Sequence, residues 1–136
     1  MSWRYSCPRC EASLNPKDYI ILVGGPSGGE RRCLVGFHPQ PGNYELHLPP
    51  GTELEEGQRW DFSCPVCHGD LTAADDDKLC ALDMLDAEGQ RRQVLFSRIA
   101  GDKATFVVAD RRIEHQFGEG AREYALHLIH LKDVIQ

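Results

Sequence analysis

The sequence predicts a mainly β protein, with an N-terminal lobe that carries a hairpin insertion, followed by an antiparallel β-meander. Two observations support this fold class. Short segments rich in β-branched and aromatic residues recur along the chain, separated by turns of Gly, Pro, Asn and Asp. Two Cys-x-x-Cys motifs also lie far apart, at residues 7–10 and 64–67. With 136 residues, 41% of them apolar, the chain is expected to form a single domain with its own core.

The first lobe, residues 1–74, contains the elements of a hairpin insertion. Tyr19–Val23 is a predicted strand, the glycine-rich segment Gly24–Gly29 a turn, and Arg32–Phe37 a return strand. Tyr44–Leu48 alternates apolar and polar residues, which indicates a half-buried strand. Arg59–Ser63 is predicted to be extended and to lead into the second cysteine motif.

The second lobe, residues 75–136, has the pattern of a β-meander and is expected to pack on the first. Leu79–Leu85, Gln93–Ile99 and Thr105–Ala109 are predicted strands, separated by turns that contain glycine. Cys80, Leu82 and Met84 share one face of the first of these strands because side chains alternate along a strand. Arg122–Val134 fits both a strand and a helix, and the strand is favoured.

The two cysteine motifs, Cys7-Pro-Arg-Cys10 and Cys64-Pro-Val-Cys67, predict one shared metal site. A tight Cys-x-x-Cys turn points two sulfurs at one ion, and two such turns complete the four-thiolate shell that structural zinc prefers. Backbone N–H groups of Glu11–Ala12 and His68–Gly69 are expected to donate hydrogen bonds to the thiolates. The predicted ligands are Cys7, Cys10, Cys64 and Cys67.

These motifs resemble the zinc-ribbon and rubredoxin-like class, whose signature is a pair of Cys-Pro-x-Cys knuckles. The resemblance covers Trp3–Asn15 and Trp60–Leu71, and it implies a zinc-ribbon-like, metal-clasped first lobe with the four cysteines as ligands. Class members commonly have glycine after the second cysteine, where this chain has Glu11 and His68. The gap of 53 residues between the motifs is also longer than the ~15–20 of a compact ribbon.

The long gap does not prevent a shared site. Closing a flexible loop of this length costs roughly 3–4 kcal/mol plus a constant. Structural zinc contributes roughly 10–16 kcal/mol of apparent binding free energy in small peptides. The metal therefore outweighs the cost of closure, and the predicted hairpin shortens the effective gap further.

Two other uses of the same cysteines remain open. Cys-Pro-x-Cys also occurs as a redox pair at the start of a long helix, but Asn15-Pro16 and the acidic Asp75–Asp77 do not continue a helix after either motif. Iron is held by the same four thiolates in a rubredoxin. Tyr5, Trp60 and Asn15–Asp18 around the knuckles resemble that family, so Fe is the alternative cofactor to Zn²⁺.

Charge and composition restrict the compartment and the partners. Residues 1–88 carry 7 basic and 15 acidic side chains, whereas residues 89–136 carry 8 and 6. A nucleic-acid-binding zinc ribbon using Arg91-Arg92 and Arg111-Arg112 is therefore only a third hypothesis. We find no secretory signal and no apolar segment long enough to cross a membrane, so we expect a cytoplasmic protein whose cysteines are metal ligands or core thiols.

The remaining cysteines and histidines are expected to have no catalytic role. Cys33 and Cys80 lie within apolar strands and are predicted to be core residues. His68 is expected to be exposed. His127 and His130, with His115 upstream, would form a second metal site only if their segment were helical. The run Asp75–Asp77 lacks the ligand spacing of a calcium loop and is predicted to be a solvated turn.

We find no catalytic motif in the sequence, and four thiolates around zinc leave no position for a reactive water. The sequence therefore favours a non-enzymatic, zinc-binding accessory module for a protein partner. A rubredoxin-like electron carrier is the alternative. Trp3, Tyr5 and Trp60 are predicted to form either a partner surface or part of the core. The sequence does not indicate an oligomeric state.

Overall fold

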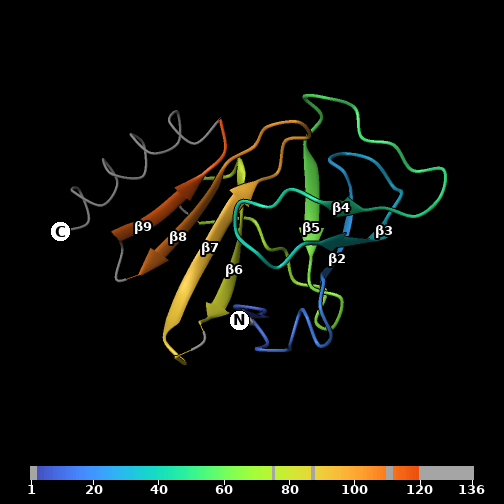
Figure 1. Cartoon of the computed structure of the whole chain (residues 1–136). Coiled ribbons are helices and arrows are strands. Elements are labelled where there is room, and N and C mark those ends of the chain that lie inside the picture. The colour runs from blue at the N-terminus through green and yellow to red at the C-terminus, as the bar shows by residue number, and fades with distance from the viewer. Residues whose placement is uncertain (1–2, 75, 87, 110–111, 120–136) are drawn as a thin grey trace.

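The computed structural model describes residues 3–74, 76–86, 88–109 and 112–119, which form two antiparallel sheets (Figure 1). The predicted mainly β class is confirmed, and the described residues contain no helix. The strands are β1 (Arg4–Ser6), β2 (Ile20–Pro26), β3 (Cys33–Phe37), β4 (Leu46–His47), β5 (Trp60–Ser63), β6 (Leu79–Leu85), β7 (Arg91–Ser97), β8 (Thr105–Ala109) and β9 (Arg112–Phe117).

The larger sheet has five strands in the order β1-β6-β7-β8-β9. Strands β6 to β9 form the meander, and each pairs with its neighbour in the chain. In β6 the predicted face is confirmed: Cys80, Leu82 and Met84 lie in the main core. The alternate residues Leu79 and Ala81 belong to a second apolar cluster, so β6 is buried on both faces.

The smaller sheet has four strands in the order β4-β3-β2-β5. Strand β2 extends beyond the predicted end, because Gly24, Gly25 and Pro26 pair with β5 instead of forming a turn. A Cβ atom on Gly24 would lie 2.9 Å from the Phe62 ring, and one on Gly25 would lie 2.0 Å from the Arg31 carbonyl oxygen. These glycines therefore permit close approach within the sheet, and the turn follows at residues 27–29.

Strand β1 places the first knuckle on the meander sheet. Its residues pair with β6, with Tyr5 opposite Met84, whereas β5, which precedes the second knuckle, belongs to the smaller sheet. The two cysteine motifs thus follow strands of different sheets. A metal held by both motifs would tie the two sheets together.

The main core lies between the two sheets. It includes Tyr5, Leu22, Trp60 and Phe62, and it contains the buried cysteines Cys7, Cys64 and Cys80. Because β-branched and aromatic residues on the inner faces of both sheets meet here, burial of their apolar surface is the main source of stability.

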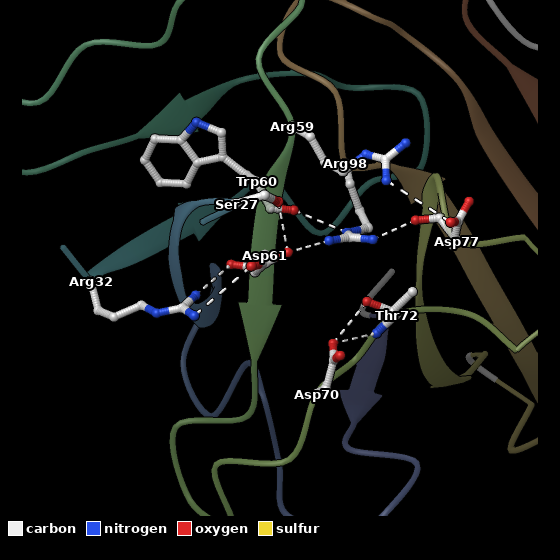
Figure 2. Close-up of polar contacts among 9 residues, drawn as sticks. All are labelled: Ser27, Arg32, Arg59, Trp60, Asp61, Asp70, Thr72, Asp77 and Arg98. Atoms are coloured by element: carbon white, nitrogen blue, oxygen red, sulfur yellow. Dashed lines mark hydrogen bonds and ion pairs between the residues drawn. The ribbon is translucent and has the colours of Figure 1, made fainter. Parts of the chain in front are cut away.

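A buried ion pair also joins the sheets (Figure 2). The Arg98 side chain, only 7% exposed, follows β7 and donates to a carboxylate oxygen of Asp61 on β5. It also donates to the backbone oxygens of Trp60, at 3.0 Å, and Asp77. The charge is therefore paired and all three sides of the guanidinium are bonded, as burial of a charge requires.

Several elements differ from the prediction. Strands β1 and β9 were not predicted, and the strand expected over Tyr44–Leu48 is only Leu46–His47. The strand expected over Gln93–Ile99 begins earlier, at Arg91, and ends at Ser97. The segment Arg122–Val134 lies outside the described residues. Within the described residues, no helix has the length and apolar character needed to cross a membrane.

Candidate metal centre

The first knuckle is a tight turn closed by backbone hydrogen bonds. The Cys7 N–H donates to the Ala12 carbonyl over 3.0 Å, and the Glu11 N–H donates to the Cys7 carbonyl over 2.9 Å. Leu14 N–H then bonds the Tyr5 carbonyl at 2.9 Å. The chain is thereby folded back on itself, which turns both cysteine side chains toward the same side.

The second knuckle repeats this arrangement 57 residues later. The Cys64 N–H donates to the Gly69 carbonyl over 3.1 Å, and the His68 N–H to the Cys64 carbonyl over 2.9 Å. Leu71 N–H bonds the Phe62 carbonyl at 3.0 Å. Each bond has its counterpart in the first knuckle, so the two turns are local copies of one structure.

The four predicted ligands, Cys7, Cys10, Cys64 and Cys67, converge. Their sulfur atoms all lie within 4.8 Å of one another. Cys7 Sγ lies 3.8 Å from Cys67 Sγ, and Cys10 Sγ lies 3.7 Å from Cys64 Sγ, in each case a contact between the two knuckles. Zn–S bonds of about 2.3 Å in a tetrahedron place sulfurs about 3.8 Å apart. The four cysteines are therefore placed to hold a single metal ion.

Backbone N–H groups surround the inner sulfurs. The Arg9 and Cys10 N–H groups lie 3.3 and 3.5 Å from Cys7 Sγ. In the second knuckle, the Val66 and Cys67 N–H groups lie 3.3 and 3.5 Å from Cys64 Sγ. These donors stabilise negative charge on sulfur.

The prediction that backbone N–H groups after each motif donate to the cysteine sulfurs is only partly correct. The Gly69 N–H donates to Cys67 Sγ over 3.4 Å, and the Ala12 N–H donates to Cys10. Glu11 and His68 instead donate to backbone carbonyls. Their N–H groups close the turn, which leaves the following residue to bond the sulfur.

The two residues that replace glycine adopt the conformation for which glycine is suited. Glu11 has φ of 65° and His68 has φ of 63°, both in the left-handed region. These are the only non-glycine residues with positive φ in the part of the chain that the structure describes. The geometry of the knuckle imposes this conformation. A left-handed residue directs the N–H groups of the residues before and after it toward the inside of the turn.

Each knuckle supplies one buried and one exposed cysteine. Cys7 and Cys64 are fully buried, whereas Cys10 and Cys67 lie at the surface. Burial raises the pKa of the Cys7 thiol above its ordinary value. Burial also acts to raise the Cys64 pKa, but hydrogen bonds from the Cys67 and Val66 N–H groups and from two neighbouring thiols lower it to about 7.

The pKa of the Cys10 thiol is raised, in contrast to that of Cys64. A backbone hydrogen bond from Ala12 lowers its pKa, but burial and three neighbouring cysteine sulfurs outweigh this and raise it to about 11. The first thiolate of the group therefore forms readily. Its negative charge then raises the pKa of the neighbouring thiols, because like charges repel. A divalent cation removes that repulsion, and it is the natural counter-charge for four sulfurs at this spacing.

The donor set determines which metals suit the site. Four thiolates in a tetrahedral arrangement favour zinc or iron over calcium and magnesium, which prefer oxygen ligands. Among the described residues the cluster contains no histidine or carboxylate. A closed shell of four protein ligands leaves no position for substrate or water.

One contact between the knuckles was not foreseen. The Arg9 Nε donates to the Asp70 carbonyl over 2.9 Å, which links the tip of the first knuckle to the base of the second. The sequence contains no signal for this bond, since the two residues are far apart in the chain and the acceptor is a backbone atom.

The other predicted residues lie outside the cluster. Cys80 is fully buried, as expected, and Cys33 is half-buried against the same core. His68 is exposed, and His115 is exposed on β9, where its ring stacks on Phe117. His127 and His130 are not among the described residues.

The aromatic residues near the knuckles are core residues. Tyr5 is 2% exposed and Trp60 is 3% exposed, and Trp3 packs against the same cluster. Of the two predicted roles, partner surface or core, the structure supports the core.

No family model matches the chain, and neither a curated protein nor a solved structure is significantly similar to it.

Proposed function

We propose that the chain is a non-catalytic zinc protein in which Cys7, Cys10, Cys64 and Cys67 hold one structural Zn²⁺. The observation that carries this proposal is the sulfur arrangement, with inter-knuckle distances of 3.8 and 3.7 Å that match the edge of a zinc–thiolate tetrahedron. The ion would join β1 of one sheet to β5 of the other and so order the surfaces around it.

A structural role follows from the shell itself. Four protein ligands saturate zinc, so the ion has no open position for hydrolytic or Lewis-acid chemistry. Binding of the metal would instead supply folding free energy, because the unfolded chain has no preformed site. We accordingly propose that the protein is an accessory module and acts by binding a protein partner.

The tip of the second knuckle is the surface we assign to that partner. Val66 is 63% exposed, the largest exposure among the large apolar residues of the described chain, and it lies between Pro65 and Cys67. An apolar side chain fixed at the apex of a rigid turn presents its surface with little loss of conformational entropy on binding.

The charge distribution does not favour a nucleic acid as partner. Arg92 pairs with Asp86, at 3.7 Å, and with Glu114. Arg91 lies 3.5 Å from Glu11. The arginines of this candidate basic patch thus have acidic neighbours, which would compete with phosphate groups.

Metal analysis tests the first part of the proposal. Protein purified without added metal or chelator should contain one zinc per chain and be colourless. Replacement by Co²⁺ should give the intense visible absorption of tetrahedral cobalt thiolate. Red protein with one iron per chain would support the electron carrier instead, and a metal-free protein that keeps its full stability would contradict both.

A pair of variants tests the second part. Val66→Asp should abolish capture of the partner from a cell extract, whereas Leu34→Asp should leave it unchanged. Leu34 is a matched control because it is another exposed aliphatic residue, 58% exposed, and it lies on β3. Equal capture by both variants would remove the knuckle tip as the partner surface.

A further inference from the structure

A cavity of about 240 Å³ lies between the two sheets, separate from the cysteine cluster. Its walls come from both sheets: Ile20, Val35 and Phe37 from β2 and β3, and Leu82, Val94 and Phe96 from β6 and β7. The lining is therefore mainly aliphatic and aromatic. A cavity of this kind is typical of a site for a small apolar ligand.

Three phenylalanines form one continuous wall of the cavity. The ring centroids of Phe37 and Phe62 are 5.3 Å apart, those of Phe37 and Phe96 are 5.2 Å apart, and those of Phe62 and Phe96 are 5.9 Å apart. The ring planes are inclined to one another, so edges and faces both line the space. Such walls suit a flat ring, which can stack on one phenylalanine and meet the edge of another.

The connection between β3 and β4, two strands of the smaller sheet, lines the cavity and contacts the meander sheet. The Tyr5 hydroxyl donates to the carbonyl of Pro39, and the Thr105 hydroxyl donates to the Tyr44 oxygen over 3.0 Å. Tyr5 and Thr105 belong to the meander sheet, so the connection is fixed at two points.

The charged groups around the cavity cancel. Arg98 and Lys103 are opposed by Glu45 and Asp102. Arg98 is already paired with Asp61, and Ser97 donates to Asp102 over 2.9 Å. Since the rim has no excess of either sign, it offers a charged ligand no compensation for the water that it would lose.

The size of the cavity sets the size of the ligand. Apolar cavities of about 150 Å³ bind benzene, so a space of about 240 Å³ accepts a larger ring system of roughly ten carbon atoms. We propose that this cavity binds an uncharged, ring-containing apolar molecule. This goes beyond the proposed zinc function and does not depend on which metal the cysteines hold.

Two probes of matched shape test the proposal on the full zinc-loaded chain. 2-Naphthol is uncharged at pH 7, and 2-naphthoate has the same rings but carries a negative charge. We expect saturable binding of 2-naphthol in ¹H–¹⁵N correlation spectra, with the largest shifts at the amides of Phe37, Phe62 and Phe96. 2-Naphthoate should bind at least tenfold more weakly.

A pair of tryptophan variants tests the location. Leu46→Trp fills the cavity from β4 and should weaken 2-naphthol binding at least tenfold, whereas Leu34→Trp adds the same group to the exposed side of β3 and should not. Zinc content and thermal unfolding show whether each variant is folded. If Leu46→Trp fails either check, it is replaced by Leu48→Phe, at another lining position, with the same expected loss.

Three results with these probes and variants would overturn the proposal, and a fourth comes from the protein alone. The three are no saturation by 2-naphthol up to its solubility limit, equal affinity for both probes, and equal affinity in both folded tryptophan variants. Shifts that appear with rising protein concentration alone would mean that a second copy of the chain fills the cavity, which also contradicts a small ligand. A chain that contains zinc and fails these tests would leave the metal function intact.

Discussion

Glu11 and His68 occupy the same position in the two knuckles and share the same left-handed backbone, with φ of 65° and 63°. Each follows the second cysteine of its motif. The N–H group of each donates a hydrogen bond of 2.9 Å to the carbonyl of the first cysteine. The conformation is therefore a property of the knuckle rather than of either side chain. It places a residue with a Cβ atom where the backbone favours glycine.

Glycine at either position should stabilise the protein. A left-handed residue with a Cβ atom costs about 1–2 kcal/mol, and glycine loses about 0.5–1 kcal/mol to the greater entropy of the unfolded chain. We expect Glu11→Gly and His68→Gly each to raise the free energy of unfolding by about 0.5–1 kcal/mol. Denaturant unfolding of the zinc-loaded protein measures this.

Alanine variants at the same positions provide the control. Glu11→Ala and His68→Ala keep the Cβ atom and its strain, so their stability should stay near that of the natural chain. The exposed ion pair of Glu11 with Arg91, at 3.5 Å, contributes little to either comparison. If glycine and alanine variants have equal stability, the backbone is not strained at these positions.

Loss of Asp61 should destabilise the protein much more than loss of Asp77, although both residues contact Arg98 (Figure 2). The Asp61 carboxylate pairs with a guanidinium that is 7% exposed, whereas Asp77 offers its backbone oxygen, which alanine retains. Breaking a buried pair from one side costs about 3–5 kcal/mol. Because Asp61 is partly exposed, we expect about 2–3 kcal/mol for Asp61→Ala.

Asp77→Ala removes only an exposed contact with Arg59, at 3.9 Å, and should cost less than about 0.5 kcal/mol. Chemical denaturation of both variants measures the difference. Similar losses in the two would mean that Arg98 is stabilised by its backbone acceptors and not by the Asp61 charge.

Cys64→Ser should abolish stoichiometric zinc binding and unfold the first ~70 residues, because an incomplete shell loses most of the metal's folding free energy. Cys33→Ser is the matched control, since Cys33 lies on β3 outside the sulfur cluster. Zinc content by elemental analysis and circular dichroism give the two readouts. Full zinc content in Cys64→Ser would disprove the shared site.

Zinc affinity should rise with pH. The metal binds thiolates, so protons compete with it wherever the thiols of the metal-free site are protonated. At pH 7.5–8.5 this holds for Cys7, whose pKa is raised by burial, and for Cys10, whose pKa is about 11. Loss of at least two protons per ion predicts an apparent affinity that rises about a hundredfold per pH unit.

Below pH 7 the slope should steepen, because Cys64, with a pKa of about 7, is then also protonated. Competition with a chromophoric chelator at several pH values measures this dependence. An affinity that does not change with pH would show that thiolates are not the ligands.

Local pattern was sufficient to predict strands of the meander and to single out the four cysteines that the structure brings together. Strands β6 and β8 have the predicted bounds, because their apolar residues are buried by neighbours close in the chain. The four cysteines were identified because a short turn fixes each pair by itself. In contrast, β9 has mostly exposed side chains, so its sequence, Arg112 to Phe117, has little apolar alternation.

Features that depend on distant residues were not predictable. The glycines of β2 form strand because β5 approaches them closely, and nothing near them in the chain indicates that partner. The same holds for Arg98, whose acceptors are at residues 60, 61 and 77, and for the cavity between the sheets. In each case tertiary packing overrides the local signal.

The distance between the knuckles along the chain also sets an order of events during biosynthesis. At translation rates of about 5–20 residues per second, Cys67 leaves the ribosome about 3 to 11 seconds after Cys10. Strand β6, on which β1 pairs, follows later still. Until Cys64 and Cys67 emerge, the nascent chain presents only two of the four thiols, so an ion shared by both knuckles would be captured only after about half of the chain has been made.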